Sequence, residues 1–595
     1  MKKPLTDEDL QERASIDGRV SFALAAFALG AGLVALLDRV GVPERIVGIL
    51  GPILALCGLS LIGLLLHAVR VSRFYAAGRS APPPYAGLAL VALATALTIP
   101  YMPPASVGVP MHAIGLGFAI GFLAIALLNG PLLRKTGAFS LPDLIAGRFP
   151  HAGVRLASIA IVGAAALLLA LAGFESSIKA LAYALGAERK YAAILVAFVL
   201  VLMIAPGGMG GVVWAATGSA GVFVAALCLP LASILIGGDA LPAPIAGGDQ
   251  VSWDKALARI AEWQTLAAAE APAGGNLAVI ATLAIGVACL APLLSPAITT
   301  ADSHAARRAG FSALIWGLLI AAIVAVSMAV SALVLDEYLV GERPDRLPSF
   351  AYAASGGGLL RICGVLSLNP EKALEACKAA TGMAGLVLRP QDFTPQGIWL
   401  LLGLPEFYGY GVAFSGLIAA AIVSMSLVLA SAGFQAFGTA IGHDGLYRVR
   451  DSSALTSRRL AMTRVVIILA VIASAAFLSV RTADTRLLIG LAILFSAATM
   501  APLLALALWP RASGNDAATA LLASLAMAAV VVGLHGTSPD IGVLAVAAVA
   551  AAISGVVVGV GVSFLHSGGL ATEGSAFVHG VLHGETDILN RDKAA

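Results

Sequence analysis

Long apolar runs recur along almost the whole chain and limit what it can fold into. About fourteen runs of roughly 18 or more apolar residues are present, each long enough to cross the hydrocarbon core of a bilayer as a helix. They occupy residues 20–38, 47–69, 86–104, 110–132, 154–178, 190–206, 211–237, 276–296, 310–336, 409–436, 460–480, 486–508, 516–535 and 540–565. Charged residues form only 12% of the 595 positions, about half the share typical of soluble proteins. The sequence therefore predicts an all-α polytopic membrane protein.

The remaining composition excludes several classes of function. The formal net charge of +3 has no basic block behind it, which argues against a nucleic-acid partner. Abundant Gly and Ala allow helices to approach closely, whereas the short alternating segments of a membrane β-barrel are absent from the sequence. The sequence also contains no Walker loop, aspartyl-phosphate domain or soluble catalytic domain. We therefore expect a protein that is not an enzyme and that draws any energy it uses from an ion gradient.

Lys and Arg residues concentrate in every second short loop, which predicts the orientation in the membrane. With a cytoplasmic N-terminus, the cytoplasmic side receives Lys2, Lys3, Arg13, Arg19, Arg70, Arg73, Arg79, Arg134, Lys135, Arg148, Arg307, Arg308, Arg448, Arg450, Arg458, Arg459, Arg511, Arg591 and Lys593. The opposite short loops hold chiefly Arg39, Arg45, Lys179, Arg189, Lys190, Arg481 and Arg486. An even number of spans then leaves both termini in the cytoplasm of a multi-pass protein of the cell inner (plasma) membrane.

Two long loops, 238–275 and 337–408, fall on the outer side in this orientation. Residues 253–266 of the first have helical periodicity and are expected to lie at the membrane interface. The second loop contains Cys363 and Cys377, for which a disulfide bond and two free thiols both stay open, because sequence spacing does not determine Cα geometry. The other three cysteines lie within spans and are interpreted as packing residues.

Few ionisable residues fall within or beside the predicted spans. Glu175 and Lys179 lie four residues apart at an outer helix end, where they are expected to pair with each other; the alternative is an outer-vestibule gate. Asp143, Asp302 and Asp444 lie beside cytoplasmic helix ends and are interpreted as helix caps.

Two spans are interrupted by proline and hydroxyl residues. Span 86–104 contains Pro100, and span 276–296 contains Pro292 and Pro296. Proline frees a carbonyl in the helix, and free backbone at membrane depth is tolerated only beside a cavity or another helix. A pair of interrupted spans points to the midplane site of an inverted-repeat transporter.

Five motifs resemble those of the sodium/solute symporter family, and more closely its acetate-permease-like (cation/acetate symporter) branch. They occur in the family's order, over roughly residues 70–510. They are Phe74–Arg79, Leu141–Phe149, the glycine-rich Pro206–Thr217, Thr299–Arg308 and Gly442–Tyr447.

The resemblance implies a LeuT-type core of two inverted five-helix repeats with extra flanking helices. The implied segments are a cytoplasmic N-terminus (1–19), two leading helices and a loop (20–85), a ten-helix symporter core (86–510), two trailing helices (511–566) and a cytoplasmic tail (567–595). The role of the first helix, which is additional to the usual family layout, stays open.

The resemblance also implies where a coupling cation and a substrate would bind. The implied cation positions are Ala92 and Thr95 on the first core helix and Met425, Val428 and Leu429 on the eighth. Val428 and Leu429 stand where the family commonly has hydroxyl side chains, although Ser424, Ser426 and Ser431 lie nearby. The predicted substrate residues are Thr95, Thr98 and Ser295, because hydroxyls and half-helix N-termini can hold a small anion where no buried Arg is available.

We therefore expect a secondary transporter that imports a small, acetate-like monocarboxylate with a cation by alternating access. The expected partners are this solute and the lipid bilayer, with a small membrane subunit left open, and no cofactor is expected beyond Na⁺ as the coupling ion. A proton-coupled carrier, a membrane sensor and a non-transporting accessory subunit are the alternatives.

Overall fold

The computed structural model describes residues 7–101, 111–237, 258, 275–356, 360–381, 387–389, 392–395, 412–534, 541–565 and 577–581. The helix expected at 253–266 and most of loop 238–275 lie outside these residues.

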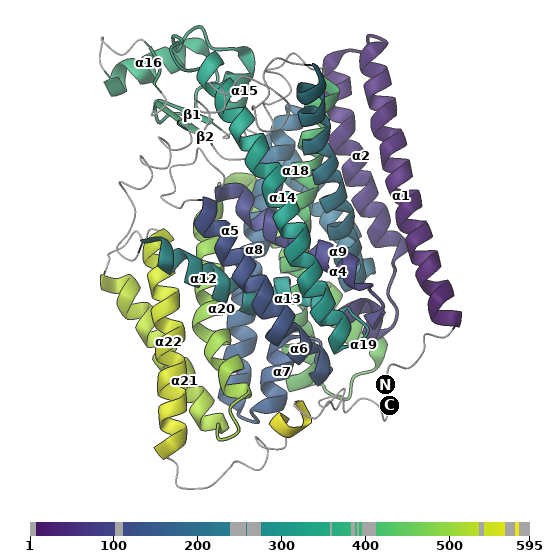
Figure 1. Ribbon diagram of the computed structural model, residues 1–595, viewed down its shortest axis with the longest axis vertical. Coiled ribbons are helices and arrows are strands. Elements are labelled where there is room, and N and C mark those ends of the chain that lie inside the picture. The colour runs from purple at the N-terminus through teal and green to yellow at the C-terminus, as the bar shows by residue number, and fades with distance from the viewer. Residues whose placement is uncertain are drawn as a thin grey trace.

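The described chain is almost entirely helical (Figure 1). The helices of its first half are α1 (Asp7–Arg39), α2 (Glu44–Leu65), α3 (Val71–Ala76), α4 (Pro83–Thr98), α5 (Met111–Ala124), α6 (Gly130–Thr136), α7 (Leu141–Arg148), α8 (Ala152–Leu185) and α9 (Arg189–Gly237). Those of the second half are α12 (Gly275–Cys289), α13 (Ala291–Ile298), α14 (Ser303–Tyr338), α15 (Ser349–Gly356), α16 (Pro370–Thr381), α18 (Val412–Gly438), α19 (Thr456–Val480), α20 (Thr485–Ala507), α21 (Gly514–Leu534) and α22 (Ile541–Leu565). A π-helical turn, Ile125–Asn129, joins α5 to α6, and a π-helical segment, Thr439–Arg450, extends α18.

Within the described ranges, 11 helices are long and apolar enough to cross a membrane, or up to 12 if the bent pair α12–α13 forms one further span. The count is lower than the fourteen predicted partly because spans 190–206 and 211–237 form one helix, α9. Residues 20–38 lie in α1, which is not among these candidates. The fourteen-span arrangement therefore stays a prediction.

Helix α9 is kinked at Gly208, which has φ 54° and ψ −143°. A side chain is excluded at this position, because a Cβ atom there would lie 2.5 Å from the carbonyl oxygen of Phe74 on α3. With 49 residues, α9 is more than twice as long as the ~20 residues that cross a bilayer. The kink thus divides α9 at the place where the sequence predicted a turn.

Helix α18 forms the centre of the bundle and packs against α8, α9, α2 and α4. Every residue from Gly416 to Gln435 is buried. Small residues allow this, since a Cβ on Gly173 of α8 would lie 2.5 Å from the backbone nitrogen of Ala430. By contrast, α14, α19 and α21 leave many large apolar side chains exposed at the outside of the bundle, as expected of surfaces that face lipid.

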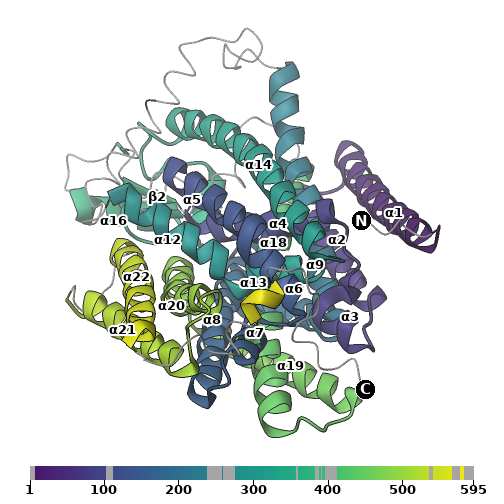
Figure 2. The same ribbon diagram turned by 60° about the horizontal axis from the view of Figure 1, so that its bottom comes forward.

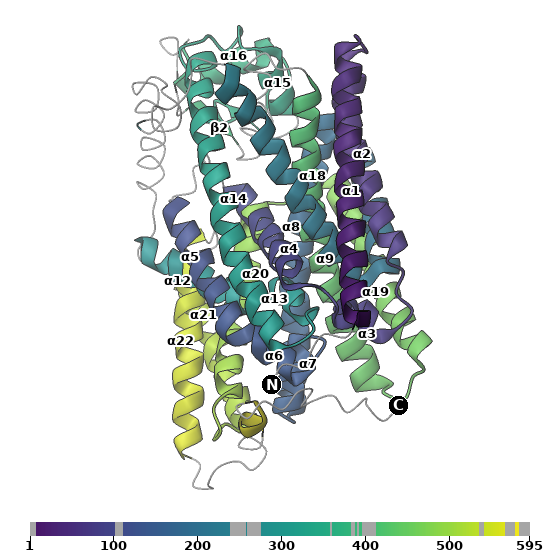
Figure 3. The same cartoon turned by 45° about the vertical axis from the view of Figure 1, so that its right-hand side comes forward.

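Part of loop 337–408 folds into a small subdomain at one end of the bundle, which we call the disulfide end (Figures 1 and 3). It contains α15, α16 and an antiparallel pair of strands, β1 (Leu360–Ile362) and β2 (Phe393–Pro395), so the all-α prediction misses one small sheet. Cys363 and Cys377 form a disulfide bond. The free-thiol alternative is therefore wrong.

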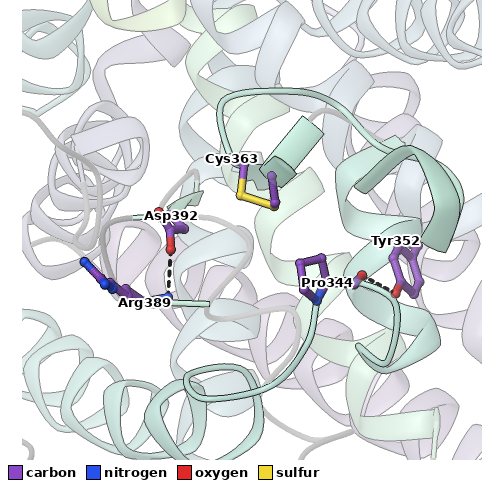
Figure 4. The surroundings of a disulfide bond; sticks show 6 residues. Pro344, Tyr352, Cys363, Arg389 and Asp392 are labelled. Carbon is purple, nitrogen blue, oxygen red and sulfur yellow. Dashed lines mark hydrogen bonds between the residues drawn. A yellow bond between two sulfur atoms is a disulfide. The ribbon is translucent and has the colours of Figure 1, made fainter. Parts of the chain in front are cut away.

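Hydrogen bonds hold the chain around this disulfide (Figure 4). The backbone N–H of Cys363 donates to the carbonyl of Asp392 at 2.7 Å. The Asp392 carboxylate accepts from the backbone N–H of Arg389 at 2.8 Å. On the neighbouring helix α15, the Tyr352 hydroxyl donates to the carbonyl of Pro344 at 2.7 Å. The subdomain is thus anchored by both a covalent bond and main-chain contacts.

At the opposite end, the tail end, a short helix, 577–581, lies against the core near α6 and α7 (Figure 2). Lys135 of α6 donates to the carbonyl of Val581 at 2.7 Å. The guanidinium of Arg148 on α7 lies 5.7 Å from the centre of the Phe577 ring. Arg148 also donates to the carbonyls of Ala507, the last residue of α20, and of Trp509 and Ala512 beyond it. The short helix is therefore joined to α6 and to the α7–α20 junction.

Candidate functional site

The bent pair α12–α13 is the main irregularity inside the bundle. The two helices meet at 45°, and Leu290 between them has an extended ψ of 116°. Helix α13 packs against both α4 and α18. The three elements implied for ion and substrate binding therefore converge, and the prediction of a broken span near Pro292 is confirmed. Span 86–104 differs, because α4 is continuous to Thr98 and only its end, Ile99–Tyr101, is a 3₁₀ turn.

Prolines free two carbonyls in this broken span, and side chains satisfy both. Pro292 has no N–H to give to the carbonyl of Ala288, four residues earlier; the Asn129 side-chain amide donates to that carbonyl at 2.6 Å instead. Pro296 likewise leaves the carbonyl of Pro292, which accepts from the Ser295 hydroxyl at 2.6 Å. Ser295, a predicted substrate residue, is thus hydrogen-bonded within its own helix.

The predicted cation positions lie on two helices that pack together, α4 and α18. Ala92, Met425, Val428 and Leu429 are all buried, and none of their side chains carries an oxygen. The carbonyl of Val428 accepts from the Ser431 hydroxyl at 2.7 Å. A cation here would therefore depend mainly on main-chain carbonyls.

Thr95 is the predicted cation residue that carries a side-chain hydroxyl. It is half-buried on α4, between buried neighbours. Its own carbonyl accepts from the Thr98 hydroxyl at 2.7 Å. The nearby Ser424 hydroxyl donates to the carbonyl of Ala421 at 2.9 Å, so it stabilises its own helix.

A small cavity of about 50 Å³ lies between α4, α5, α12, α20 and α22. Its walls are mostly apolar and include Leu97, Ile114, Phe118, Leu283 and Ile493. Of the three predicted substrate residues, Thr98 lines this cavity, whereas Thr95 and Ser295 do not.

Two further hydroxyls in the cavity wall were not predicted, and both are hydrogen-bonded. Tyr101 donates to the carbonyl of Arg486 at 2.8 Å, and Thr282 donates to the carbonyl of Ala545 at 2.6 Å. These bonds join α4 to α20 and α12 to α22. The cavity therefore offers an apolar interior with few polar groups.

Arg486 lies beside this cavity and was not predicted as a site residue. It is half-buried on α20, three and four residues before the lining residues Ile489 and Gly490. This spacing places it on the same face of the helix, one turn beyond the cavity. The spacing was visible in the sequence, but the sequence does not reveal which face of α20 meets α4.

A charged cluster joins α8, α9 and α19 at the end of α8 remote from α7. Glu175 is fully buried, with Lys179 at 3.5 Å and Arg189 bound to both carboxylate oxygens. Arg189 also donates to the carbonyls of Leu478 and Arg481, at 2.7 and 2.9 Å. The predicted Glu175–Lys179 pair is confirmed, and Arg189 is the partner that the sequence analysis missed.

A second polar cluster is buried at the tail end, where α7, α19 and the π-helical segment after α18 meet. The Asp444 carboxylate accepts from the Ser140 hydroxyl at 2.5 Å and lies 2.7 Å from Nδ1 of His443. On the other side of the imidazole, the Arg459 guanidinium contacts Nε2. Because Arg459 can only donate, Nε2 must accept, and Nδ1 carries the proton toward Asp444. His443 is thus neutral and bridges the two charged groups.

Aromatic rings enclose this second cluster. The Tyr75 ring lies 4.8 Å from the His443 ring, and the Arg459 guanidinium lies 4.3 Å from the centre of the Tyr447 ring. The Tyr75 hydroxyl is hydrogen-bonded to that of Thr463 at 2.7 Å. Burial raises the pKa of Tyr75 to about 12, against partly compensating contacts with Thr463 and Arg459. Tyr75 is therefore neutral at physiological pH.

The aspartates near the helix ends differ from one another. The Asp302 carboxylate accepts from the N–H of Ala305 at 2.6 Å, and that of Asp143 accepts from the N–H of Phe139 at 3.3 Å. The capping interpretation is thus confirmed for these two. It is wrong for Asp444, which is buried inside a side-chain network. Among the residues that the structure describes, no group of three or more His, Cys, Asp and Glu side chains could hold a metal ion.

Comparisons with solved structures define the fold. A Na⁺-coupled sialic acid symporter in a substrate-bound, outward-open state superposes with a TM-score of 0.64 at 16% identity, over 88% of this chain and 98% of that chain. MHP1, a nucleobase-cation-symport-1 family transporter with bound bromovinylhydantoin, gives 0.49 at 14% identity, over 86% and 98%. A manganese transporter of Eremococcus coleocola gives 0.40 at 15% identity, over 86% and 95%. The first of these superpositions shows that this multi-pass membrane protein has a LeuT-like fold.

The sequence comparison finds one family model that matches part of the chain. Residues 74–347 match the model of the Sodium:solute symporter family. This part of the chain, a little under half of it, is therefore similar to a family of transporters. No curated protein matches the sequence.

Proposed function

We propose that this protein imports a small, acetate-like monocarboxylate together with Na⁺, by alternating access around α4 and the broken pair α12–α13. The observation that carries the proposal is the cavity of about 50 Å³ beside the end of α4. One water needs about 10–15 Å³ of such space, so the cavity accommodates roughly three to five non-hydrogen atoms. A short carboxylic acid has this size, whereas a sugar does not.

Arg486 supports an anionic solute. A half-buried guanidinium one turn from the cavity attracts negative charge and can bind a carboxylate through two N–H groups. The apolar walls formed by Leu97, Ile114 and Phe118 suit the short alkyl part of such a solute. The acetate-permease-like branch, proposed from the motifs, fits the same solute class.

For the cation we propose a site between α4 and α18, formed by Ala92, Thr95, Met425, Val428 and Leu429. Its ligands would be mainly backbone carbonyls, with Thr95 as the side-chain hydroxyl. Thr95→Val keeps the volume but removes the oxygen, so it should raise the Na⁺ concentration needed for uptake. Val428→Ser adds an oxygen and should lower that concentration. If both variants leave Na⁺ dependence unchanged, the ion does not bind there.

We further propose the topology and segments that the sequence predicts. Fourteen spans with both termini in the cytoplasm place the ten-helix core at 86–510, between the leading segment 20–85 and the trailing segment 511–566. The disulfide bond between Cys363 and Cys377 supports an extracytoplasmic position for loop 337–408, because disulfides persist in oxidising compartments. Glycosylation or thiol-labelling tags at the two ends of the chain would test this orientation.

The direct test is uptake of labelled acetate into proteoliposomes that contain the purified protein. We expect uptake driven by an inward Na⁺ gradient and competition by other short monocarboxylates. Uptake driven only by a pH gradient would indicate a proton-coupled carrier. Absence of uptake for a panel of short acids would favour a sensor or an accessory subunit.

A charge variant tests the solute class separately. Arg486→Gln should raise the KM for acetate at least about tenfold, since a bidentate, charge-assisted contact is lost. Arg481→Gln is the matched control, because Arg481 is exposed in the short loop between α19 and α20. Equal KM values for the two variants would contradict a carboxylate site at Arg486.

A further inference from the structure

The hydrogen bond between Asn129 and Ala288 connects two irregular helical segments, the π-helical turn after α5 and the broken pair α12–α13. Ala288 lies two residues before the break at Leu290, and its carbonyl has lost its helical donor because residue 292 is proline. Asn129 supplies the missing N–H at 2.6 Å. The donor and the acceptor are separated by 159 residues, so this bond is a tertiary contact at the break.

A π-helical turn, Ile125–Asn129, presents the Asn129 side chain to this carbonyl. The N–H of Gly130 donates to the carbonyl of Ile125, five residues earlier. The extra residue rotates the following side chains by about 100° relative to a regular α-helix. Leu127 and Leu128 are 44% and 56% exposed, whereas Asn129 is half-buried against the broken pair. Such π-turns frequently occur at functional sites.

The two halves of the broken pair rest on different parts of the bundle. Helix α12 packs mainly against α5, α20 and α22, whereas α13 packs mainly against α4, α6 and α18. Asn129 stands between α5 and α6, at the junction of these two sets. A change in the bend between α12 and α13 must therefore alter the contact that Asn129 makes.

We infer that Asn129 is a positioning residue that holds the end of α12 on the α5–α6 helix. It thereby controls how often the end of α12 moves away from that helix, a motion that we call opening of the break. The inference goes beyond the proposed function, because it does not depend on which solute or ion is carried. Without the amide donor, the carbonyl of Ala288 has no partner in the closed arrangement, and open arrangements become more populated.

A native cysteine next to the break allows a direct test. Cys289 follows Ala288 and is only 4% exposed. The other two free cysteines are Cys57 and Cys228, and changing both to Ser leaves Cys289 as the free thiol beside the intact Cys363–Cys377 disulfide. The rate at which N-ethylmaleimide labels Cys289 in proteoliposomes then reports opening of the break, with no solute present.

In this background, Asn129→Leu removes the donor at similar volume and should speed labelling of Cys289 about fivefold, as expected for one lost hydrogen bond within a membrane. Asn129→Gln keeps an amide donor and should label less than twofold faster than the parent. Ser524→Ala is the control for general loosening, because it removes a buried hydrogen bond to the carbonyl of Ala551 on α22; it should leave the rate unchanged. An unchanged rate in Asn129→Leu, or an equal rise in Ser524→Ala, would overturn the inference.

A second substitution tests the carbonyl itself. Pro292→Ala restores a backbone N–H that can pair with the carbonyl of Ala288. Added to Asn129→Leu, it should return the labelling rate of Cys289 to that of the parent. Uptake of labelled acetate by the double variant should nevertheless be slower than by the parent, since a continuous helix replaces the break. A labelling rate that stays fast would show that this carbonyl is not the relevant partner. Restored uptake would show that Asn129 merely satisfies a carbonyl. Either result overturns the inference.

Discussion

The two buried polar clusters at opposite ends of α8 hold helices together in different ways. The first, which we call the Glu175 cluster, places this carboxylate against two cations, Lys179 and Arg189. In the second, which we call the Asp444 cluster, this carboxylate reaches the Arg459 guanidinium through a neutral imidazole, that of His443. Direct charge pairing resists opening, whereas a chain of hydrogen bonds can be broken at any one link. We therefore expect the Glu175 cluster to be the more rigid one, and the following variants test this difference.

The largest effect on stability is expected at the Glu175 cluster. Glu175→Ala leaves Arg189 without its carboxylate and should lower the free energy of unfolding by about 3 kcal/mol, as for other broken buried ion pairs. Unfolding of the purified protein in mixed detergent micelles measures this value. Glu188→Ala is the control, because Glu188 is 68% exposed and pairs with the exposed Lys190; little change is expected. Similar losses for both variants would contradict the role of burial.

A smaller effect on stability is expected at the Asp444 cluster. His443→Leu removes the bridge between Asp444 and Arg459 and should cost about 2 kcal/mol, because two buried charged groups lose a hydrogen-bond partner. The same micelle assay measures this loss. Hydrogen exchange should show faster opening of residues 439–450 than of α8. If opening instead spreads equally to α8, the two clusters are coupled and the contrast between them fails.

Tyr75 tests the hydrogen bonds around the bridge. Tyr75→Phe keeps the ring but loses the bond to Thr463 and should cost about 1 kcal/mol. The pKa of Tyr75 is raised from 10 to about 12 by burial, so its neutral form stabilises the folded protein. This contribution is complete below pH 10 and is lost as the pH rises through 12. The difference in melting temperature between the variant and the natural protein should therefore shrink between pH 10 and 12, and a constant difference would contradict the assignment.

Lys179 should contribute least. Its ammonium group lies 3.5 Å from Glu175 and is 17% exposed, and Arg189 already binds both carboxylate oxygens. Lys179→Ala should therefore change the free energy of unfolding by less than about 0.5 kcal/mol. A loss as large as that of Glu175→Ala would show that Lys179, not Arg189, neutralises the carboxylate.

Features that depend on local chemistry could be predicted from the sequence. Proline at 292 and 296 indicated the break between α12 and α13, because proline removes helical donors wherever it stands. The caps formed by Asp143 and Asp302 follow from residues only three or four positions away. The pair Glu175–Lys179 likewise lies on one helical face. In these cases the interacting groups are neighbours along the chain.

Features that depend on which helices meet could not be predicted in the same way. Asp444 resembles a cap in sequence, but its partner Ser140 lies 304 positions away. In the sequence, Arg486 is interpreted as a loop residue. Its place beside the cavity follows only from the packing of α20. Asn129 shows no sequence signal, since a π-helical turn depends on packing rather than on a motif. Tertiary contacts, not local propensity, determine these residues.

The short helix 577–581 has a consequence for how the protein is made. Lys135 is synthesised 446 residues before its acceptor, the carbonyl of Val581. At about 5–20 residues per second, a ribosome needs roughly 20–90 s to cover that distance. During this time α6 and α7 have already been synthesised, while the short helix that will pack against them has not. The tail end is thus completed last, after the ribosome has passed every helix of the bundle.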